Sequence, residues 1–308
     1  MLLACPARAD VARFLAKLKI DAKAAGVSSA TFDEALSGFA PVPRIIELDR
    51  AQPEKRKSFA EYRKSLLGGD RVPRGRRLFI EEAKLLTSVS KAYGVSPQVV
   101  VALWGIETSY GAITGGFKVP VALATLAMDG RRPEFFRGEL IKALSILEQK
   151  HIKASDMTGS WAGAMGQPQF MPSSFLAYAV DWDGDGRRDI WNTRGDVFAS
   201  AANYLAKSGW KAGEPWGVEV KIPPGIDVSP LCGLEKKLSM GYWQEMGVSP
   251  KAGGSLSGLP SEASLVMPDG PSGDAFLVFN NYRVLMTWNR ATYFASAVGL
   301  LADSIAAR

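Results

Sequence analysis

Hydrophobic positions along the first 210 residues recur mostly at the spacing of helices. From Asp10 to Ala25, apolar residues repeat every three or four positions, and Gly26 offers a natural stop. Ser96 and Pro97 form a strong helix start, a capping hydroxyl followed by proline at the first helical position. The same reasoning predicts helices over 10–25, 28–36, 58–67, 74–93, 97–110, 120–130, 133–151, 172–180 and 195–209.

Two other stretches depart from this spacing. Residues 39–55 are punctuated by prolines, which predicts an extended or turn-rich path. From Gly213 onward apolar residues alternate with polar ones, so 216–225, 263–270 and 274–288 are predicted strands around Pro-Asp-Gly turns. Residues 291–307 return to helical spacing. The pattern therefore predicts a helical body, a small β-containing insertion at 213–285 and a terminal helix.

One carboxylate interrupts the apolar helix predicted over 97–110. Glu107 shares a helix face with Val100, Leu103 and Trp104, and the opposite face is apolar too. Removal from water disfavours an ionised carboxylate, so such a residue can hold a proton near neutral pH and act as a general acid. The alternative is a glutamate at a helix end that emerges into solvent.

Composition removes several competing chemistries. The chain of 308 residues has one histidine, His151, at a charged helix end where a surface position is expected, and two cysteines. A histidine-dependent triad would rest on that residue alone, and His/Cys zinc sites and a disulfide scaffold are excluded by count. The formal net charge of +6 comes from short basic runs scattered between acids, which are interpreted mostly as solvated surface. This charge is compatible with nucleic acid and equally with another anionic polymer.

A second stretch, GSWAGAMGQPQFMPSSF at 159–175, is rich in small residues. Small residues permit close approach of a ligand, and Gln167 and Gln169 offer amides to polar groups. A tight crossing of two helices would explain the same composition. The glycines after Glu107, at 111–116, suggest a loop that lines a cleft.

Several motifs together resemble one enzyme family. WGIETSYG, ALATLA, GAMGQPQFMPSSF, DWDGDGRRDIWN and SAANYL occur in this order, and ELDRAQPE and NYRVLMTWNRATYFASAVGLLAD flank them. The chain is similar over nearly its whole length to the membrane-bound lytic murein transglycosylase B family, glycoside hydrolase family 103. The resemblance implies a mainly α fold, with a lysozyme-like helical catalytic core, a flanking helical domain and a small β-containing domain.

The implied organisation has four parts after a short leader. Residues 10–90 form the N-terminal helical domain, 91–212 the catalytic core and 213–285 the β-containing domain, while the helix at 286–308 packs on the helical body. Residues 1–9 are interpreted as the remnant of an export signal, with Cys5 as a lipidation site or Ala9 as a cleavage end, or else as a misannotated start.

The resemblance also implies an activity and a set of site residues. Enzymes of this family cleave the β-1,4 bond between N-acetylmuramic acid and N-acetylglucosamine in peptidoglycan and leave a 1,6-anhydromuramoyl end. Glu107 matches the single catalytic carboxylate, acid first and base afterwards. No cofactor is expected for catalysis. Phe294 departs from the family pattern, where a tyrosine is expected, and Pro168 replaces a commoner glycine-type neighbour. The matched substrate-binding residues are Ser160, Gln169, Tyr204, Arg131, Arg132 and Asn289.

A loop rich in aspartates predicts a metal site. Asp181, Asp183 and Asp185 occupy positions 1, 3 and 5 of an EF-hand-like loop, and the carbonyl of Arg187 would follow at position 7. Asn192 stands where a regular EF-hand has a bidentate glutamate. The resemblance implies a longer loop closed by Asp196, and therefore a structural Ca²⁺. The alternative is an acidic turn that caps the next helix.

Two other functions remain open beside the transglycosylase. A water-using muramidase would act on the same substrate but needs a second carboxylate, and a non-catalytic peptidoglycan-binding protein would keep only the fold. The expected partners are peptidoglycan glycan strands and other cell-wall enzymes, with no nucleic acid, and the expected state is a monomer. A peptidoglycan substrate predicts a periplasmic protein or an outer-membrane lipoprotein.

Overall fold

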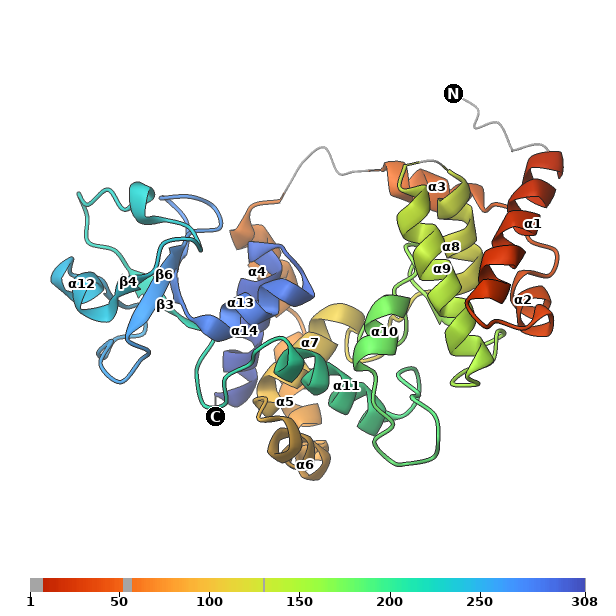
Figure 1. Cartoon of the computed structure of the whole chain (residues 1–308). Coiled ribbons are helices and arrows are strands. Elements are labelled where there is room, and N and C mark those ends of the chain that lie inside the picture. The colour runs from red at the N-terminus through yellow and green to blue at the C-terminus, as the bar shows by residue number, and fades with distance from the viewer. Residues whose placement is uncertain (1–7, 52–56, 130, 308) are drawn as a thin grey trace. The chain divides into compact units, whose positions relative to one another are not determined.

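A computed structural model describes residues 8–51, 57–129 and 131–307 of the chain. Within this part the chain forms fourteen α-helices and short strands, so it is mainly helical, as predicted. The backbone groups into two compact units, each made of two segments (Figure 1). Unit 1 comprises residues 1–54 and 107–201, and unit 2 comprises 55–106 and 202–308. The four-part division predicted from the sequence stays a prediction.

Unit 1 is built around two helices, α8 (Val119–Met128) and α9 (Pro133–Glu148), which lie side by side in Figure 1. Eight residues of α8 are buried, because this helix is apolar on all faces. The Ser28 side chain caps α2 and also donates to Glu148 at the end of α9 at 2.8 Å, which joins the two helices. The other helices of this unit are α1 (Arg8–Ala24), α2 (Ser29–Leu36), α3 (Pro43–Arg50), α10 (Pro172–Tyr178) and the first part of α11 (Arg194–Lys207).

The extended path predicted for residues 39–55 is wrong over its centre, where α3 runs from Pro43 to Arg50. Pro43 is the first helical residue, a position where a proline loses no helical hydrogen bond. Ile45 and Asp49 are the buried residues of this helix. Pro43 was thus a helix-start signal, and burial of Ile45 stabilises a helix too short to persist alone.

Two very short strands belong to unit 1. The strands β1 (Phe117–Lys118) and β2 (Thr158–Gly159) pair antiparallel, with Phe117 opposite Gly159. A Cβ atom on Gly115 would collide with the backbone of Gly159, so the absence of a side chain is required for this pairing. The pairing brings the loop after Glu107 beside the start of the 159–175 stretch.

Unit 2 packs its last helix against earlier ones. The helix α14 (Thr292–Ala306) contacts α4 (Phe59–Leu67), α5 (Arg71–Glu81) and α13 (Asn280–Trp288). Gly299 of α14 lies against the indole of Trp216, and a Cβ there would overlap the ring. The predicted helix over 74–93 is broken at Glu82 into α5 and α6 (Ala83–Tyr93), which precede α7 (Pro97–Thr108).

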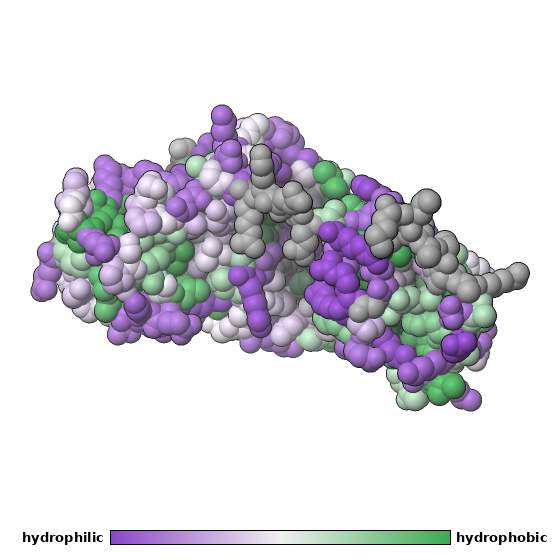
Figure 2. Space-filling view, turned by 90° about the horizontal axis from the view of Figure 1, so that it is seen from above, coloured by the Kyte–Doolittle hydropathy of each residue, from purple (hydrophilic) through white to green (hydrophobic). Residues whose placement is uncertain are grey.

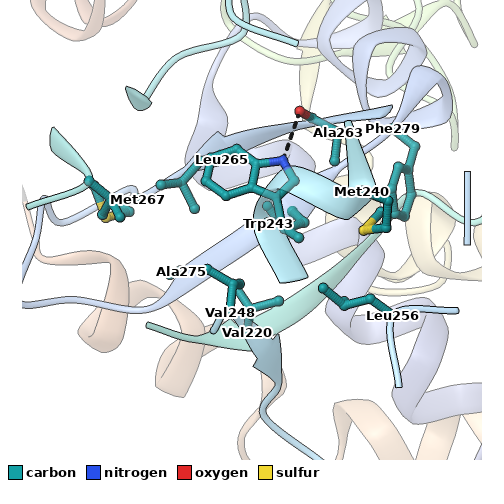
Figure 3. Close-up of a cluster of buried hydrophobic side chains, with 12 residues drawn as sticks. Val220, Met240, Trp243, Val248, Leu256, Ala263, Leu265, Met267, Ala275 and Phe279 are labelled. Carbon is teal, nitrogen blue, oxygen red and sulfur yellow. Dashed lines mark hydrogen bonds between the residues drawn. The ribbon is translucent and has the colours of Figure 1, made fainter. Parts of the chain in front are cut away.

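A small antiparallel sheet forms the β-containing part of unit 2. Its strand order is β4-β6-β7-β3-β5. The indole of Trp243, on α12 (Met240–Glu245), is fully buried against this sheet and donates to the carbonyl of Ala263 at 3.4 Å (Figure 3). The elements of this part are β3 (Gly217–Lys221), a 3-10 turn (Ser229–Leu231), β4 (Leu238–Ser239), α12, β5 (Ser249–Pro250), β6 (Glu262–Val266) and β7 (Ala275–Val278).

The strand predicted over 274–288 ends early. The strand β7 stops at Val278, and Asn280 begins α13. Tyr282 and Leu285 are both buried, at the i, i+3 spacing of one helix face, and the Glu214 carboxylate accepts the N–H of Asn280 at 2.7 Å. The sequence pattern in this stretch therefore reflected the buried face of a helix as well as a strand.

Charged side chains tie the sheet to helix α4. The guanidinium of Arg63 contacts Glu219 of β3 and Asp274 at 2.8 Å each, and hydrogen bonding to Glu219 raises the pKa of Arg63. The Asp269 carboxylate accepts the N–H groups of Phe59 and Ala60 at 2.6 and 3.1 Å. Asp269 thus caps α4 from a turn of the β-containing part.

In Figure 2, hydrophilic and apolar residues are interspersed over the face that is seen. Among the described residues, no helix combines the length and apolar character needed to cross a bilayer. The lipidation site predicted at Cys5 lies outside the described residues, whereas Ala9 belongs to α1.

Candidate active site and metal loop

Glu107 is the penultimate residue of α7, and its side chain is half-buried. The preceding turns are almost wholly apolar, and the residues from Val99 to Trp104 are at most 4% exposed. In unit 2, the guanidinium of Arg71 donates to the carbonyl of Gly105 at 2.7 Å, near the C-terminal end of the helix. A cation at this end of a helix is favourable because unpaired carbonyls make it partly negative.

The chain reverses sharply directly after Glu107. Ser109 and Tyr110 have φ values of 51° and 59°, and Gly111 follows with 78°. Gln169, in the small-residue stretch, has a φ of 53°. Left-handed conformations cost non-glycine residues free energy and persist only where surrounding contacts hold them. Such contacts are present at both positions.

Thr108 supplies the first of these contacts. Its side chain is 1% exposed, and its Oγ1 donates to the carbonyl of Gln167 at 2.9 Å. The same oxygen accepts the N–H of Gly111 at 3.1 Å. Thr108 therefore fixes the end of α7 both to its own loop and to the 159–175 stretch. Thr108 was not singled out from the sequence. The only indication in the sequence was that a residue with a hydroxyl directly follows Glu107.

Gln167 and Gln169 lie on the other side of the junction, which is the contact between the end of α7 and the 159–175 stretch. The Gln169 amide donates to the carbonyls of Thr114 at 3.0 Å and Gly166 at 2.8 Å. Gln167, which is buried, donates to the carbonyl of Trp191 at 2.7 Å. The structure thus brings Gln169 to the loop that follows Glu107, whereas Gln167 is used within the fold.

Ser160 lies in the same compact stretch. Its Oγ accepts the N–H of Ala164 at 3.0 Å, and its backbone N–H donates to the carbonyl of Ala164 at 2.8 Å. Gly166 contacts the next loop so closely that a Cβ would lie 2.7 Å from the carbonyl oxygen of Ile190. The small residues therefore serve close backbone packing, and this packing sets the position of the polar side chains.

The two predicted substrate-binding arginines have different surroundings. Arg131 contacts the Asp49 carboxylate at 3.3 Å and its backbone carbonyl, and the Asp49 side chain is 6% exposed. The guanidinium of Arg132 lies over the rings of Phe136 and Phe135, at 4.9 and 5.3 Å from their centroids. Arg131 is thus engaged in the fold, while Arg132 has an exposed cation–π arrangement.

Tyr204 and Asn289 belong to unit 2. The Tyr204 hydroxyl donates to the carbonyl of Thr287 at 2.7 Å, and its ring meets Trp288 edge to face at 4.8 Å. Asn289 is exposed directly after α13. The structure brings these polar and aromatic groups together at one end of α13. Phe294 is buried in α14 and offers no hydroxyl.

The aspartate loop gathers three of the predicted metal ligands. Oxygen atoms of Asp181, Asp183 and Asp196 lie within 4.8 Å of one another. Two oxygens bound to one Ca²⁺ at its usual 2.3–2.6 Å can be at most about 5 Å apart. The loop turns through Gly184 and Gly186, which both have positive φ, and Asp181 accepts their N–H groups at 2.8 Å each. This all-oxygen donor set fits calcium.

Two of the residues considered for the loop have other roles. The carboxylate of Asp185 contacts the guanidinium of Arg187 at 3.1 Å, and the Arg187 N–H and guanidinium lower the pKa of Asp185. Asn192 donates its amide to Asp189. Asp189, which sequence reasoning missed, is buried and accepts the N–H of Trp191 at 3.0 Å. Asp185 is thus outside the convergent group, and Asn192 closes a turn.

Burial marks Asp196 as the central acid of this group. Its side chain is 1% exposed, and removal from water raises its pKa to about 6. It accepts the N–H groups of Trp182 at 2.8 Å and Asp189 at 2.6 Å, which orient its oxygens. A bound cation would favour the ionised carboxylate that burial disfavours.

His151 lies beside this loop and is buried, so the predicted surface position is wrong. Its Nδ1 accepts the N–H of Arg188 at 3.2 Å, and its ring packs on Phe175. Burial lowers the pKa of His151. The charged neighbours in sequence suggested exposure, but the imidazole packs on Phe175 and binds the backbone of Arg188.

Comparison with known proteins now identifies the family. A family model described as "Transglycosylase SLT domain" matches residues 10–303. The chain belongs to the transglycosylase SLT domain family. This transglycosylase is 32% identical over 252 residues to membrane-bound lytic murein transglycosylase B of Escherichia coli (strain K12), covering 81% of this chain and 68% of that protein.

Solved structures agree over nearly the whole length of this transglycosylase. SltB3 from Pseudomonas aeruginosa, in complex with NAG-anhNAM-pentapeptide, has a TM-score of 0.92 and 46% identity, covering 96% of this chain and 79% of that one. The Escherichia coli lytic transglycosylase Slt35, in complex with calcium, has a TM-score of 0.79 and 30% identity, covering 96% and 92%. The predicted mainly α, lysozyme-like fold and the predicted family are confirmed.

Proposed function

We propose that this lytic transglycosylase cleaves the β-1,4 bond between N-acetylmuramic acid and N-acetylglucosamine in peptidoglycan, with Glu107 as its single catalytic carboxylate. The main support for the proposal is that hydrogen bonds hold the end of α7, where Glu107 lies, in a fixed position. The carboxylate ends an apolar helix, and the next residue, Thr108, is buried and hydrogen-bonded to the stretch that bears Gln169. The two complexes of SltB3 with muropeptide fragments support the substrate class.

The proposed reaction needs one proton-transfer group. Protonated Glu107 donates its proton to the glycosidic oxygen as the C1–O bond breaks. The resulting carboxylate then takes the proton of the muramoyl C6 hydroxyl while that oxygen forms the new bond to C1. The attacking hydroxyl belongs to the same sugar, so its effective concentration is high and no water has to be activated. Glu107 ends the cycle protonated, as it began.

The remaining site residues are proposed to bind the glycan and its peptide. Gln169 and Ser160 contact sugar near Glu107, and Tyr204 and Asn289 border a sugar subsite. Arg132 meets anionic groups of the peptide, with Arg131 holding the adjacent loop.

A structural Ca²⁺ is the second part of the proposal. Asp181, Asp183 and Asp196 supply its oxygens, supported by their mutual distances and by the calcium complex of Slt35. The ion would neutralise the buried Asp196 and hold the loop. It takes no part in proton transfer.

Cellular location follows from the substrate in this proposal. Peptidoglycan lies outside the cytoplasmic membrane, so we expect a periplasmic monomer, anchored to the outer membrane if Cys5 is lipidated. Cell fractionation of the wild-type protein and of Cys5→Ser tests the anchor, because loss of the thiol should release a lipoprotein from the membrane fraction.

Digestion of purified peptidoglycan followed by mass spectrometry tests the activity. Anhydromuropeptides support the proposal, reducing ends indicate a water-using muramidase, and binding without release indicates a non-catalytic protein. Glu107→Gln keeps the size of the side chain but cannot transfer the proton, so we expect product release to fall by at least a thousandfold with an unchanged melting temperature. Normal turnover by this variant would exclude Glu107 as the acid.

A further inference from the structure

Unit 2 contains a polar cavity that the proposed chemistry does not use. Its volume is about 480 Å³, and it lies where α13 begins. Its lining includes Ala263 and Phe279, which belong to the hydrophobic cluster of Figure 3, so part of the cavity wall is packed core. Its charged lining residues are Lys211, Glu214, Lys237, Glu262 and Arg283.

Arg283 is held in a fixed position by neutral acceptors. Its Nη2 atom donates to the carbonyl of Leu234 and to the Oγ of Ser264, at 2.7 Å each. Ser264 is fully buried and itself donates to Leu234 at 3.3 Å. No described carboxylate lies within ion-pair distance of this guanidinium. Its remaining N–H groups form a fork that matches a carboxylate.

The other charges divide into a paired set and an unpaired set. Glu214 caps α13 through Asn280 and lies 3.8 Å from Lys211, so both charges are locally compensated. Lys237 is exposed and makes no ion pair within the described part of the chain. Glu262 is also exposed. The available charges are thus two cations and one acid, which suits a ligand with carboxylates and an amine better than a simple polyanion.

We propose that this cavity binds a peptide stem of the peptidoglycan strand, with Arg283 and Lys237 taking its carboxylates. This inference rests on the proposed function. Arg283 lies on α13, and Asn289 follows it by six residues, directly after the helix ends, so their backbones are separated by about 9 Å at about 1.5 Å per residue. An extended pentapeptide spans up to about 17 Å. A stem on a muramoyl residue bound near Trp288 and Asn289 can therefore reach the cavity.

The test compares glycan strands that carry pentapeptide stems with strands stripped of their stems by an amidase. For the wild-type protein we expect a KM about tenfold lower on the stem-bearing strands. Lys237→Gln and Arg283→Gln should each remove most of this preference by raising KM on stem-bearing strands alone. Lys236→Gln is the matched control, because its Nζ contacts the carbonyl of Pro230 and it does not line the cavity.

The outcomes separate this proposal from the enzymatic one. Equal KM values of the wild-type protein on both strands, an unchanged preference in Lys237→Gln, or an equal loss in Lys236→Gln would each overturn the stem site. The KM of Arg283→Gln is interpreted only if the variant keeps the wild-type melting temperature. If it does not, the result for Lys237→Gln decides. Absence of anhydro products would instead overturn the proposed function. The stem site can then be tested by binding alone. Calorimetric titration would measure the affinity of the Glu107→Gln protein, and of the same protein with Lys237→Gln added, for stem-bearing and for stripped strands.

Discussion

The hydroxyl of Thr108 donates to the backbone carbonyl of Gln167 across a distance of 2.9 Å, between two residues far apart in the sequence. This bond is buried and links the end of the helix that carries Glu107 to the turn that carries Gln169. The proposed acid and the proposed sugar-binding amide therefore have positions that depend on one side-chain oxygen.

Replacing Thr108 by valine should reduce both stability and turnover. The variant keeps the shape but removes the hydroxyl that bonds to the Gln167 carbonyl and to the Gly111 N–H, and loss of these two hydrogen bonds costs about 1–3 kcal/mol. We expect kcat to fall about tenfold to a hundredfold because Glu107 loses its fixed position. Thr108→Ser restores the hydroxyl and should retain most of the wild-type kcat, measured by release of anhydromuropeptides. Equal activity in valine and serine variants would show that the bond does not position the acid.

Calcium should raise the melting temperature of the protein. Binding at a concentration of 100 times Kd adds about 2.7 kcal/mol of stability, which corresponds to a rise of several degrees. Asp183→Asn removes one of the three convergent carboxylates and should abolish this rise. Asp156→Asn, at an exposed acid of unit 1, is the control and should leave it intact. The prediction fails if chelator has no effect on the wild-type melt.

Stability without calcium should depend on pH through Asp196. Its pKa rises from 3.8 in the unfolded chain to about 6 in the folded one, because burial disfavours the charge. The folded state therefore binds the proton more tightly, and this contribution is full below about pH 4 and lost as pH rises through about 6. His151 acts in the opposite direction, because burial lowers its pKa and its neutral form stabilises the fold above its unfolded value of 6.5.

The two contributions can be separated by chemical denaturation in chelator across this pH range. The difference in unfolding free energy between wild type and Asp196→Asn isolates the aspartate, and it should fall as pH rises from 4 to 7. Added calcium should remove most of that fall. A difference that is flat with pH would mean that Asp196 titrates alike in both states.

The two arginines should separate into a structural and a substrate-binding residue. Arg131→Gln leaves the buried Asp49 carboxylate without its cation, and we expect a loss of about 1–2 kcal/mol because the guanidinium is 44% exposed. Asp49→Asn in the same protein should restore part of this stability. Arg132→Gln should instead raise KM with a nearly unchanged melting temperature. A loss of stability in Arg132→Gln, together with a raised KM and unchanged stability in Arg131→Gln, would contradict the contact between Arg131 and Asp49.

The sequence predicted the fold class and the family because those features depend on long periodic patterns and on several independent motifs. It failed where tertiary contacts decide local structure. The helix at Pro43–Arg50 depends on burial of Ile45, and the helix beginning at Asn280 depends on a cap from Glu214, which lies 66 residues earlier. Neither contact can be read from local spacing.

The sequence indicates which residue types to consider for the candidate site, but the contacts of these residues come from the tertiary structure. Glu107 and Gln169 are placed near the same junction, but the need for Thr108 follows only from the carbonyl that it meets. The sequence predicted Asp181, Asp183 and Asp196 for one metal site, and their oxygens lie within 4.8 Å of one another. The contact of Asp185 with Arg187 depends on rotamers that a loop pattern does not specify.

The contacts of Asp269 have a consequence for exchanging parts between relatives. Its carboxylate caps α4 through Phe59 and Ala60 and also accepts the hydroxyl of Tyr293 at 2.7 Å, so one turn of the β-containing part serves two helices from distant parts of the sequence. A chimaera that replaces residues 213–285 alone would remove the Asp269 carboxylate from the N–H groups of Phe59 and Ala60 and from the hydroxyl of Tyr293, while the capping box of Ser58 and Glu61 would stay. Grafts between transglycosylases of this family should therefore carry the segments around residues 59, 269 and 293 as one set.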